Sequence, residues 1–355
     1  MSSLTIAFHS NQLSLRGTEV ALFDYAEGAE NQLGHRSVIV HPADSPGNDP
    51  QAIARFRDRF EVFTYRHRSE LDGLLRDRGA DLLYAIKAGR RDGLVSTQVP
   101  TMVHAVFPTH PRQAHGASFA FISDWLSQGC SRGHIPAVPH IVTLPRVDGD
   151  LRDELGIPGS ARVLGCHGGA SSFDVPCAIE AVKRVLATRD DSWFVFLNIA
   201  RFTDHPRAVF LPGTSDLARK TRFINTCDAM LHARLQGESF GLACGEFSIR
   251  NKPVITYARS KHRHHIDVLG DAGWLYQGAD DLVSLIGSLD PDAIRRGRWD
   301  RYTPLYNPER VMELFDQHLI QPALRNPDRM HPQLRTDWRD TLAYWRLKLA
   351  MRFDG

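Results

Sequence analysis

Two glutamates, Glu238 and Glu246, stand eight residues apart in the stretch GESFGLACGEF, with two glycines and only small or apolar side chains between them. We expect a loop up to Phe240 and then a helix over residues 241–249, whose first N–H groups can bind an anion. Each carboxylate can accept hydrogen bonds from one hydroxylated ring, while the amides between them, approachable at Gly241, bind a negatively charged bridge. A nucleotide sugar has this shape. The alternative is a capping carboxylate followed by a surface glutamate.

Two further loops have residue types that suit a phosphate. The loop over residues 10–19 places Gly17 at the start of a helix. The loop over residues 166–174, CHGGASSFD, offers close backbone approach at Gly168 and a hydroxyl at Ser171, where a second helix begins. A tight turn with a serine N-cap explains either loop equally well.

Strands and helices alternate along both halves of the chain, which positions these loops at one edge of each sheet. In the first half we expect strands over residues 4–9, 36–41, 60–65, 81–86 and 101–107, and helices over 18–33 and 70–79. In the second half we expect strands over 161–166, 192–198, 227–232, 253–257 and 274–276, and a helix over 174–187. This alternation predicts βαβ units and parallel sheets, in which ligands bind beyond the carboxyl ends of the strands.

The segment IVTLPRVDGD, residues 141–150, contains the proline and glycine of a domain boundary. At 355 residues the chain is too long for one ordinary core. We therefore expect two Rossmann-like, doubly wound α/β domains, residues 1–145 and 146–325, facing each other across a cleft. Residues 326–355 are expected to contain a last helix that crosses back to the first domain.

Composition limits the classes of partner and compartment. The formal net charge of +2 gives no electrostatic argument for nucleic acid. The five cysteines are odd in number and lack CxxC spacing, so we expect reduced core thiols in a cytoplasmic protein. No apolar run approaches the ~20 residues of a membrane span, so any membrane contact is peripheral.

The last helix offers a candidate for such a contact. Trp338, Leu342, Trp345 and Leu349 fall on one helix face, and the basic residues of the segment lie mostly off it. We expect this helix to pack on the first domain. The alternative is a membrane-surface helix on the inner face of the membrane, which suits an enzyme acting on lipid-linked acceptors.

The histidines His262, His264 and His265 invite a metal interpretation, but no second ligand cluster has zinc-like spacing. Asp148-Gly149-Asp150 has the pattern of a metal-binding Asp-x-Asp motif, yet it falls in the predicted linker. We therefore predict no bound metal and no cofactor.

One segment, CDAMLHARLQGESFGLACGEFSIRNKPVITY, resembles the donor-binding segment of retaining GT-B glycosyltransferases of family 4. Members of that family carry a Glu-x7-Glu motif before a short helix and then a Lys-Pro-Val-Ile-type strand. RGTEVALFDYAEGAENQLGHRSVIV is similar to the first loop and helix of their first domain, and AFISDWLSQGC with VTLPRVDGDLRDELGIPGSARVLG to the passage between the domains. The resemblance covers residues 1–290 in outline.

The resemblance implies roles for individual residues. Glu246 would contact the ribose hydroxyls of the donor, and Glu238 would lie beside the hydroxyls of its sugar. Gly17 would lie under the diphosphate, and His104 would be close to the reacting centre. The backbone amides that would meet the sugar and phosphate are those of Phe240, Gly241 and Leu242.

The chain departs from the family at the cations that neutralise the leaving diphosphate. The family has an arginine and a lysine after the first strand of the second domain, where this chain has HGGASS and no lysine or arginine until Lys183. We expect Arg201 and Lys220 to supply the charge, with Arg234 and the helix start at Ser171 as further candidates.

The predicted function is transfer of a sugar, with retention, from a nucleoside-diphosphate sugar to a saccharide, lipid-linked or other hydroxyl acceptor in polysaccharide biosynthesis. One alternative is a nucleotide-sugar epimerase or hydrolase on the same fold. The other is a catalytically silent nucleotide- or carbohydrate-binding protein, which the missing Arg/Lys pair favours.

Overall fold

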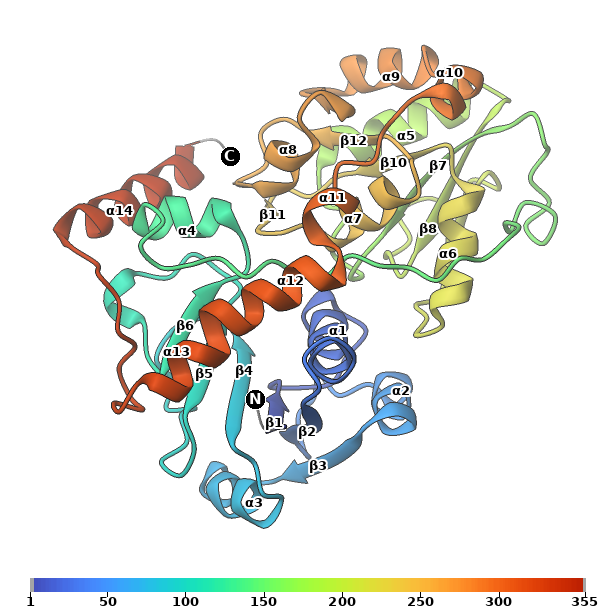
Figure 1. Ribbon diagram of the computed structural model, residues 1–355. Helices are drawn as coiled ribbons and strands as arrows, with labels where there is room; N and C mark the ends of the chain where they lie inside the picture. Colours follow the sequence, from blue (N-terminus) through green and yellow to red (C-terminus); the bar gives the residue numbers. More distant parts are fainter. Residues whose placement is uncertain (1–2, 354–355) are drawn as a thin grey trace. The chain divides into compact units, whose positions relative to one another are not determined.

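The computed structural model describes residues 3–353, which divide into two compact units. Unit 1 comprises the residues up to Ile141 together with Tyr306–Arg352, and unit 2 comprises Val142–Leu305. Each unit is built on its own six-stranded parallel sheet (Figure 1). The boundary between the domains was expected between residues 145 and 146, and in the structure it lies between residues 141 and 142.

The sheet of unit 1 has the strand order β3-β2-β1-β4-β5-β6. Its strands are β1 (Thr5–His9), β2 (Arg36–Pro42), β3 (Glu61–Tyr65), β4 (Leu82–Lys87), β5 (Thr101–Ala105) and β6 (Ser118–Phe121). Its connecting helices are α1 (Gly17–Asn31), α2 (Pro50–Arg59), α3 (Leu71–Asp77) and α4 (Asp124–Ser131). The central strands are buried along their whole length, because helices cover both faces of a parallel sheet.

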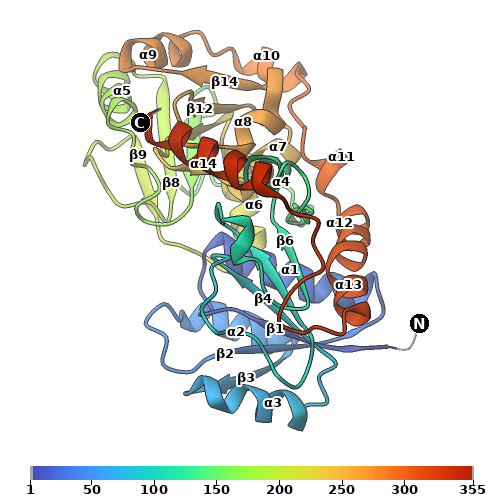
Figure 2. The ribbon, with the colours of Figure 1, turned by 90° about the vertical axis from the view of Figure 1, so that its left-hand side faces the viewer.

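The C-terminal part of unit 1 is helical. It contains α12 (Pro308–Phe315), α13 (Gln321–Arg325) and, up to Arg352, α14 (Trp338–Phe353), while α11 (Thr303–Tyr306) spans the boundary and lies mostly in unit 2. α12 packs closely on α1. The contact requires a glycine at position 28 of α1, because a Cβ there would lie 2.7 Å from the side chain of Met312 on α12. α14 lies beside α4 in both views (Figure 1 and Figure 2).

The sheet of unit 2 has the order β14-β12-β10-β7-β8-β9. Its strands are β7 (Arg162–His167), β8 (Ser192–Leu197), β9 (Ala208–Leu211), β10 (Ala229–His232), β12 (Val254–Tyr257) and β14 (Gly273–Tyr276). A separate parallel pair joins β11 (Gly237–Glu238) to β13 (His262–Arg263). The helices are α5 (Pro176–Thr188), α6 (Leu217–Thr226), α7 (Leu242–Ile249), α8 (His264–Leu269), α9 (Ala279–Gly287) and α10 (Pro291–Arg296).

Two parallel doubly wound domains were expected and are confirmed. Among the elements that the sequence interpretation did not place are α2, α4, β6 and β9, because short segments carry little signal. Across residues 3–353, no helix combines the length and apolarity that a bilayer crossing requires.

Candidate functional site

Glu246 is buried in unit 2, where two basic side chains from other elements surround its carboxylate. Lys220 Nζ, on α6, donates to Oε1 at 2.6 Å, and His167 Nε2, at the end of β7, lies 2.9 Å from Oε2. α7 aims Glu246 at both partners because it starts beyond the end of β10, the strand next to β7. The site thus forms at the carboxyl edge of the sheet, where ligands of such folds bind.

The surroundings of Glu246 favour its charged form. Burial raises the pKa of this carboxyl, but the positive charges of Lys220 and His167 outweigh burial and hold the pKa below its usual range. The His167 contact is not aligned as a hydrogen bond, so Oε2 accepts none from the described residues. A buried carboxylate oxygen with acceptor capacity left is suited to a ligand hydroxyl.

Glu238 forms a second cluster on β11. Arg234 Nη1 donates to its Oε1 at 2.9 Å, and His232 Nε2, at the end of β10, lies 3.4 Å from the same oxygen. Burial raises the pKa of Glu238, but hydrogen bonding from His232 and the charge of Arg234 lower it to about 2. Burial raises the pKa of Cys166 on β7 to about 12, and the charge of Glu238 adds to that rise. Both glutamates therefore lie near the carboxyl end of β7.

The backbone between the two glutamates turns at Gly241. Its φ of +95° is in the left-handed region, and a Cβ there would lie 2.9 Å from the Cβ of His265. α7 begins at the next residue, Leu242, with no side-chain cap on its first N–H groups. Phe240 is buried against the ring of His264, with centroids 5.4 Å apart, which anchors the turn.

The loop after β7 corrects one expectation. α5 begins at Pro176 with Val175 as its N-cap, so Ser171 precedes the helix and does not lie at its N-terminus. Ser172 bonds the carbonyl of Gly169 within a local turn, and a Cβ on Gly168 would lie 2.3 Å from the Ser172 hydroxyl oxygen. The proline at the first helical position explains the later start.

The cations predicted at the diphosphate have different surroundings. Lys220 is 8% exposed and paired with Glu246. Arg201 is exposed, lies over the ring of Phe210 and is 3.8 Å from Asp204. Arg234 is half-buried on Glu238. The structure therefore brings Lys220 and Arg234 to the two glutamates, and Arg201 to neither.

Of the two predicted residues of unit 1, Gly17 lies at the start of a helix and His104 lies near the end of a strand. Gly17 is exposed at the start of α1, after a loop held by Glu19, which accepts from Ser10 Oγ at 3.0 Å. His104 is fully buried on β5: Nδ1 lies 2.8 Å from the Tyr84 hydroxyl, and Nε2 lies 2.8 Å from the Val138 carbonyl. A catalytic role for His104 stays a prediction, and it requires a ligand to replace one of these bonds.

His167 and His232 are site residues that sequence reasoning missed. Each is the last residue of a strand, β7 and β10, and each contacts one of the two glutamates. The sequence did contain a signal for them: each is a polar residue at the carboxyl end of an otherwise apolar parallel strand, where ligands bind in such sheets.

The absence of a bound metal stays a prediction. Within residues 3–353, no group of three or more His, Cys, Asp or Glu side chains is placed to hold a metal ion. His265 instead contacts Thr256 at 3.0 Å, and His262 lies 2.7 Å from the Gln236 side chain.

No protein-family model matches the chain, and no curated protein matches its sequence. Solved structures do match. S. aureus TarM in complex with Fondaparinux, alpha-GlcNAc-glycerol and UDP has a TM-score of 0.64 at 10% identity, covering 91% of this chain and 100% of that chain. Anabaena Alr3699/HepE in complex with UDP-glucose has a TM-score of 0.61 at 13% identity, covering 91% and 98%.

A UDP-N-acetylglucosamine 2-epimerase also matches, with a TM-score of 0.56 at 12% identity, covering 95% of this chain and 100% of that one. At such identities the likeness shows the fold alone. The chain has the GT-B fold of glycosyltransferases, as the sequence resemblance implied.

Proposed function

We propose that this protein is a retaining, metal-independent glycosyltransferase that transfers a sugar from a nucleoside-diphosphate donor to a hydroxyl acceptor. The observation that carries the proposal is the pair of ionised glutamates at the carboxyl edge of the unit 2 sheet, Glu246 buried and Glu238 partly buried, separated by the uncapped start of α7. The GT-B fold, shared with structures solved with UDP and UDP-glucose, supports it. The expected setting is polysaccharide biosynthesis in the cytoplasm, with a saccharide or lipid-linked acceptor.

In this proposal the two glutamates hold opposite ends of the donor. Glu246 accepts from the ribose hydroxyls through Oε2, while Lys220 and His167 keep it anionic. Glu238 accepts from a hydroxyl of the transferred sugar. The amides of Phe240, Gly241 and Leu242 meet the sugar and phosphate, and Gly168 permits close approach to the diphosphate.

The proposed reaction is a front-face displacement. The bond between the anomeric carbon and the phosphate oxygen breaks, and the acceptor oxygen bonds to the same face of that carbon. The departing diphosphate takes the acceptor proton, so no enzyme nucleophile is required. Arg234 and Lys220 are the cations best placed to stabilise the leaving charge, and electrostatic stabilisation is commonly the largest catalytic term.

Donor binding tests this function directly. A thermal-shift screen with UDP-, GDP-, ADP- and TDP-sugars should show stabilisation by one nucleotide class, because a ligand that binds only the folded state raises its stability. The anomeric configuration of the product, read by NMR with a responsive donor and an acceptor panel, tests retention. No shift with any nucleotide sugar would contradict the proposal.

The second candidate is a nucleotide-sugar epimerase, favoured by the structural match to an epimerase. The two are separated by incubating the responsive donor without acceptor. An epimerase yields a new nucleotide sugar, whereas a transferase leaves the donor intact or releases free sugar slowly. Binding without turnover under either condition would favour the silent binding protein.

A further inference from the structure

Helix α14 packs on unit 1 through one face only. Asp340 is fully buried and lies 2.9 Å from His134 Nδ1. The ring of Tyr344 lies 5.1 Å from that of His110, and Leu347 lies over Gly129 of α4, where a side chain would have no room. These residues and the buried Met351 follow helical spacing, so they form the inner face of the helix.

The opposite face is apolar and exposed. Trp338, Leu342, Trp345 and Leu349 are 68%, 41%, 52% and 48% exposed. At about 100° per residue they lie within one narrow stripe, whose centre is about 160° from the centre of the inner face. Four of the ten exposed large hydrophobic side chains of the described chain thus gather on one helix. The helix was expected to pack on the first domain, and it does so while leaving this stripe in solvent.

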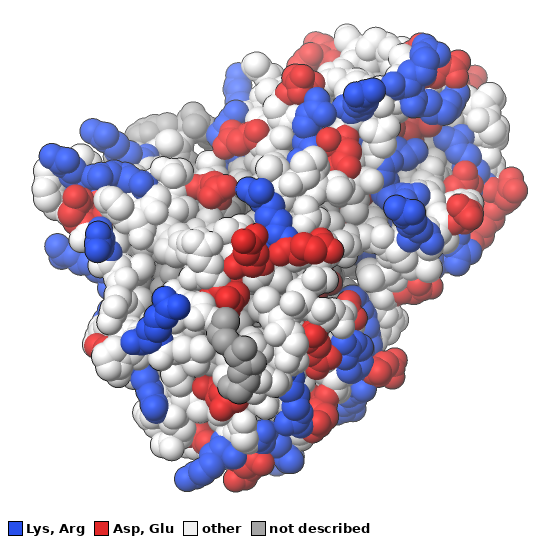
Figure 3. Space-filling model, viewed as in Figure 1, with Lys and Arg blue, Asp and Glu red and all other residues white. Residues whose placement is uncertain are grey.

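Cations flank the stripe on both sides. Arg339 and Arg346 lie along one edge, and Lys348 and Arg352 along the other, at about 100° per residue. Among the described residues, Arg346, Lys348 and Arg352 form no ion pair, and the only acidic residue of α14 is the buried Asp340. Figure 3 shows Lys and Arg side chains gathered over this helix.

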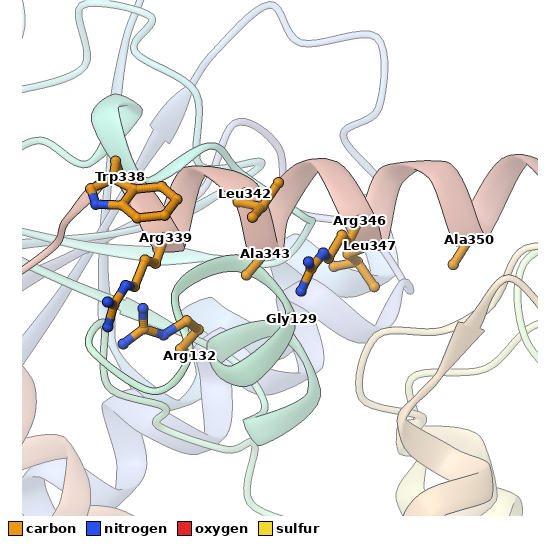
Figure 4. Close-up of a pocket in the computed structure, with 9 residues that line it drawn as sticks. All are labelled: Gly129, Arg132, Trp338, Arg339, Leu342, Ala343, Arg346, Leu347 and Ala350. Atoms are coloured by element: carbon orange, nitrogen blue, oxygen red, sulfur yellow. The ribbon is translucent and has the colours of Figure 1, made fainter.

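A groove of about 650 Å³ runs between α14 and α4 (Figure 4). Gly129, Ala343 and Leu347 line it, and the guanidinium groups of Arg132, Arg339 and Arg346 border it. Trp338 and Leu342 of the stripe line the groove as well, and Figure 4 shows Arg339 and Arg346 on the side of α14 that faces α4. Positive charge therefore stands beside apolar surface along the whole helix.

This pattern matches a phospholipid surface better than a second copy of the chain. Tryptophan prefers the membrane interface, and long basic side chains beside an apolar stripe reach the headgroups while their stems stay in the apolar layer. Pairing two copies through this stripe would bring the same four cations against each other, which like-charge repulsion opposes. Anionic headgroups supply the complementary charge.

We propose that α14 binds unit 1 to the surface of an anionic phospholipid bilayer, with the Trp338–Leu342–Trp345–Leu349 stripe in the interface and its four cations at lipid phosphates. The proposal does not rest on the sugar-transfer activity. It places the helix on the membrane through the face that the fold leaves uncovered.

The test is sedimentation of the full chain with vesicles of phosphatidylcholine alone and of equal parts phosphatidylcholine and phosphatidylglycerol. The chain should bind only the anionic vesicles, with a blue shift in tryptophan emission and weaker binding at high salt. Trp345→Ser with Leu349→Ser, and separately Arg346→Glu with Lys348→Glu, should each weaken binding by about tenfold or more.

Matched control variants are Leu324→Ser, an exposed leucine on α13, and Arg66→Glu, an exposed arginine of unit 1, which should bind as the parent does. Because all substituted side chains are at least partly exposed, thermal melting should show the variants folded. Equal binding to both vesicle types, no binding to either, or parent-like binding by both α14 variants would overturn the proposal. A dimer in size-exclusion chromatography that Trp345→Ser abolishes would replace the lipid with a second copy.

Discussion

At the scale of single residues, the site depends on how Glu246 is kept charged while buried. An isolated buried carboxylate is strongly disfavoured, and Lys220 and His167 compensate for it from two other elements. The same contacts leave Oε2 of Glu246 without a hydrogen bond from the described residues, so this oxygen can accept one from a ligand. Under the proposed function, stability and donor binding both depend on the Lys220–Glu246 pair, and one substitution should affect both.

Glu246→Gln should raise the donor KM by about tenfold or more, because a neutral amide binds hydroxyls more weakly than a carboxylate does. It should also lower the free energy of unfolding by about 3 kcal/mol, because Lys220 loses its buried counter-ion. Initial-rate kinetics and urea unfolding measure the two effects. The matched control is Glu61→Gln, which breaks an exposed pair with Arg36 and should cost about 1 kcal/mol or less.

Glu238→Gln should lower kcat by roughly 100-fold while the donor KM changes little, if Glu238 orients the transferred sugar at the reacting centre. Arg234→Ala should follow Glu238→Gln in kcat, since Arg234 holds that carboxylate at 2.9 Å. Arg201→Ala is the comparison, because its side chain contacts neither glutamate. An equal loss for Arg201→Ala would assign the diphosphate to Arg201 instead.

At the scale of elements, the turn before α7 is what separates the two glutamates. The chain leaves β11, passes through a left-handed glycine and enters a helix whose first N–H groups have no side-chain cap. Those amides are available because no Ser, Thr, Asp or Asn stands at the N-cap. In the proposed function, a ligand oxygen would accept from these amides in place of a side-chain cap.

Gly241→Ala should destabilise unit 2 by about 2 kcal/mol, since a Cβ there adds strain at positive φ and lies 2.9 Å from His265 Cβ. Nucleotide-sugar binding should weaken as well, because the first amides of α7 shift. Thermal melting with and without donor measures both. Gly159→Ala, at a glycine with open space around it, should leave both unchanged.

At the scale of the whole molecule, buried histidines make stability depend on pH. Burial lowers the pKa of His104 in unit 1 to about 4 and that of His264 in unit 2 to about 4. An unfolded chain protonates these groups near pH 6.5, whereas the folded chain does not until lower pH. The folded state therefore loses stability as pH falls from 6.5 toward 4.

Urea unfolding at pH 7.5 and at pH 5 should show this loss, roughly 2 kcal/mol for each such histidine by pH 5. Glu238 acts at lower pH: with its pKa lowered to about 2, it stabilises the fold above pH 4.5 and loses that contribution as pH falls toward 2. Glu238 therefore contributes little to the change in stability between pH 7.5 and pH 5. Equal stability at pH 7.5 and pH 5 would contradict the burial of neutral imidazole.

The alternation of strands and helices, the ligand edge of each sheet and the Glu-x7-Glu spacing were all readable from local sequence. Apolar periodicity and turn residues depend on neighbours along the chain, so strands such as 82–87 and the helix after Gly241 were placed within a residue or two. The start of α5 was misplaced because a proline four residues beyond Ser172 outweighed the serines as a helix start.

Only the tertiary structure decided which side chains meet. Lys220 pairs with Glu246 from 26 residues away, and His167 on β7 contacts Glu246 from farther still along the chain. It also decided which face of α14 is covered, because both faces carry large apolar residues and periodicity cannot choose between them. Ion pairs and burial arise from contacts between distant segments, and a pattern of near neighbours does not contain them.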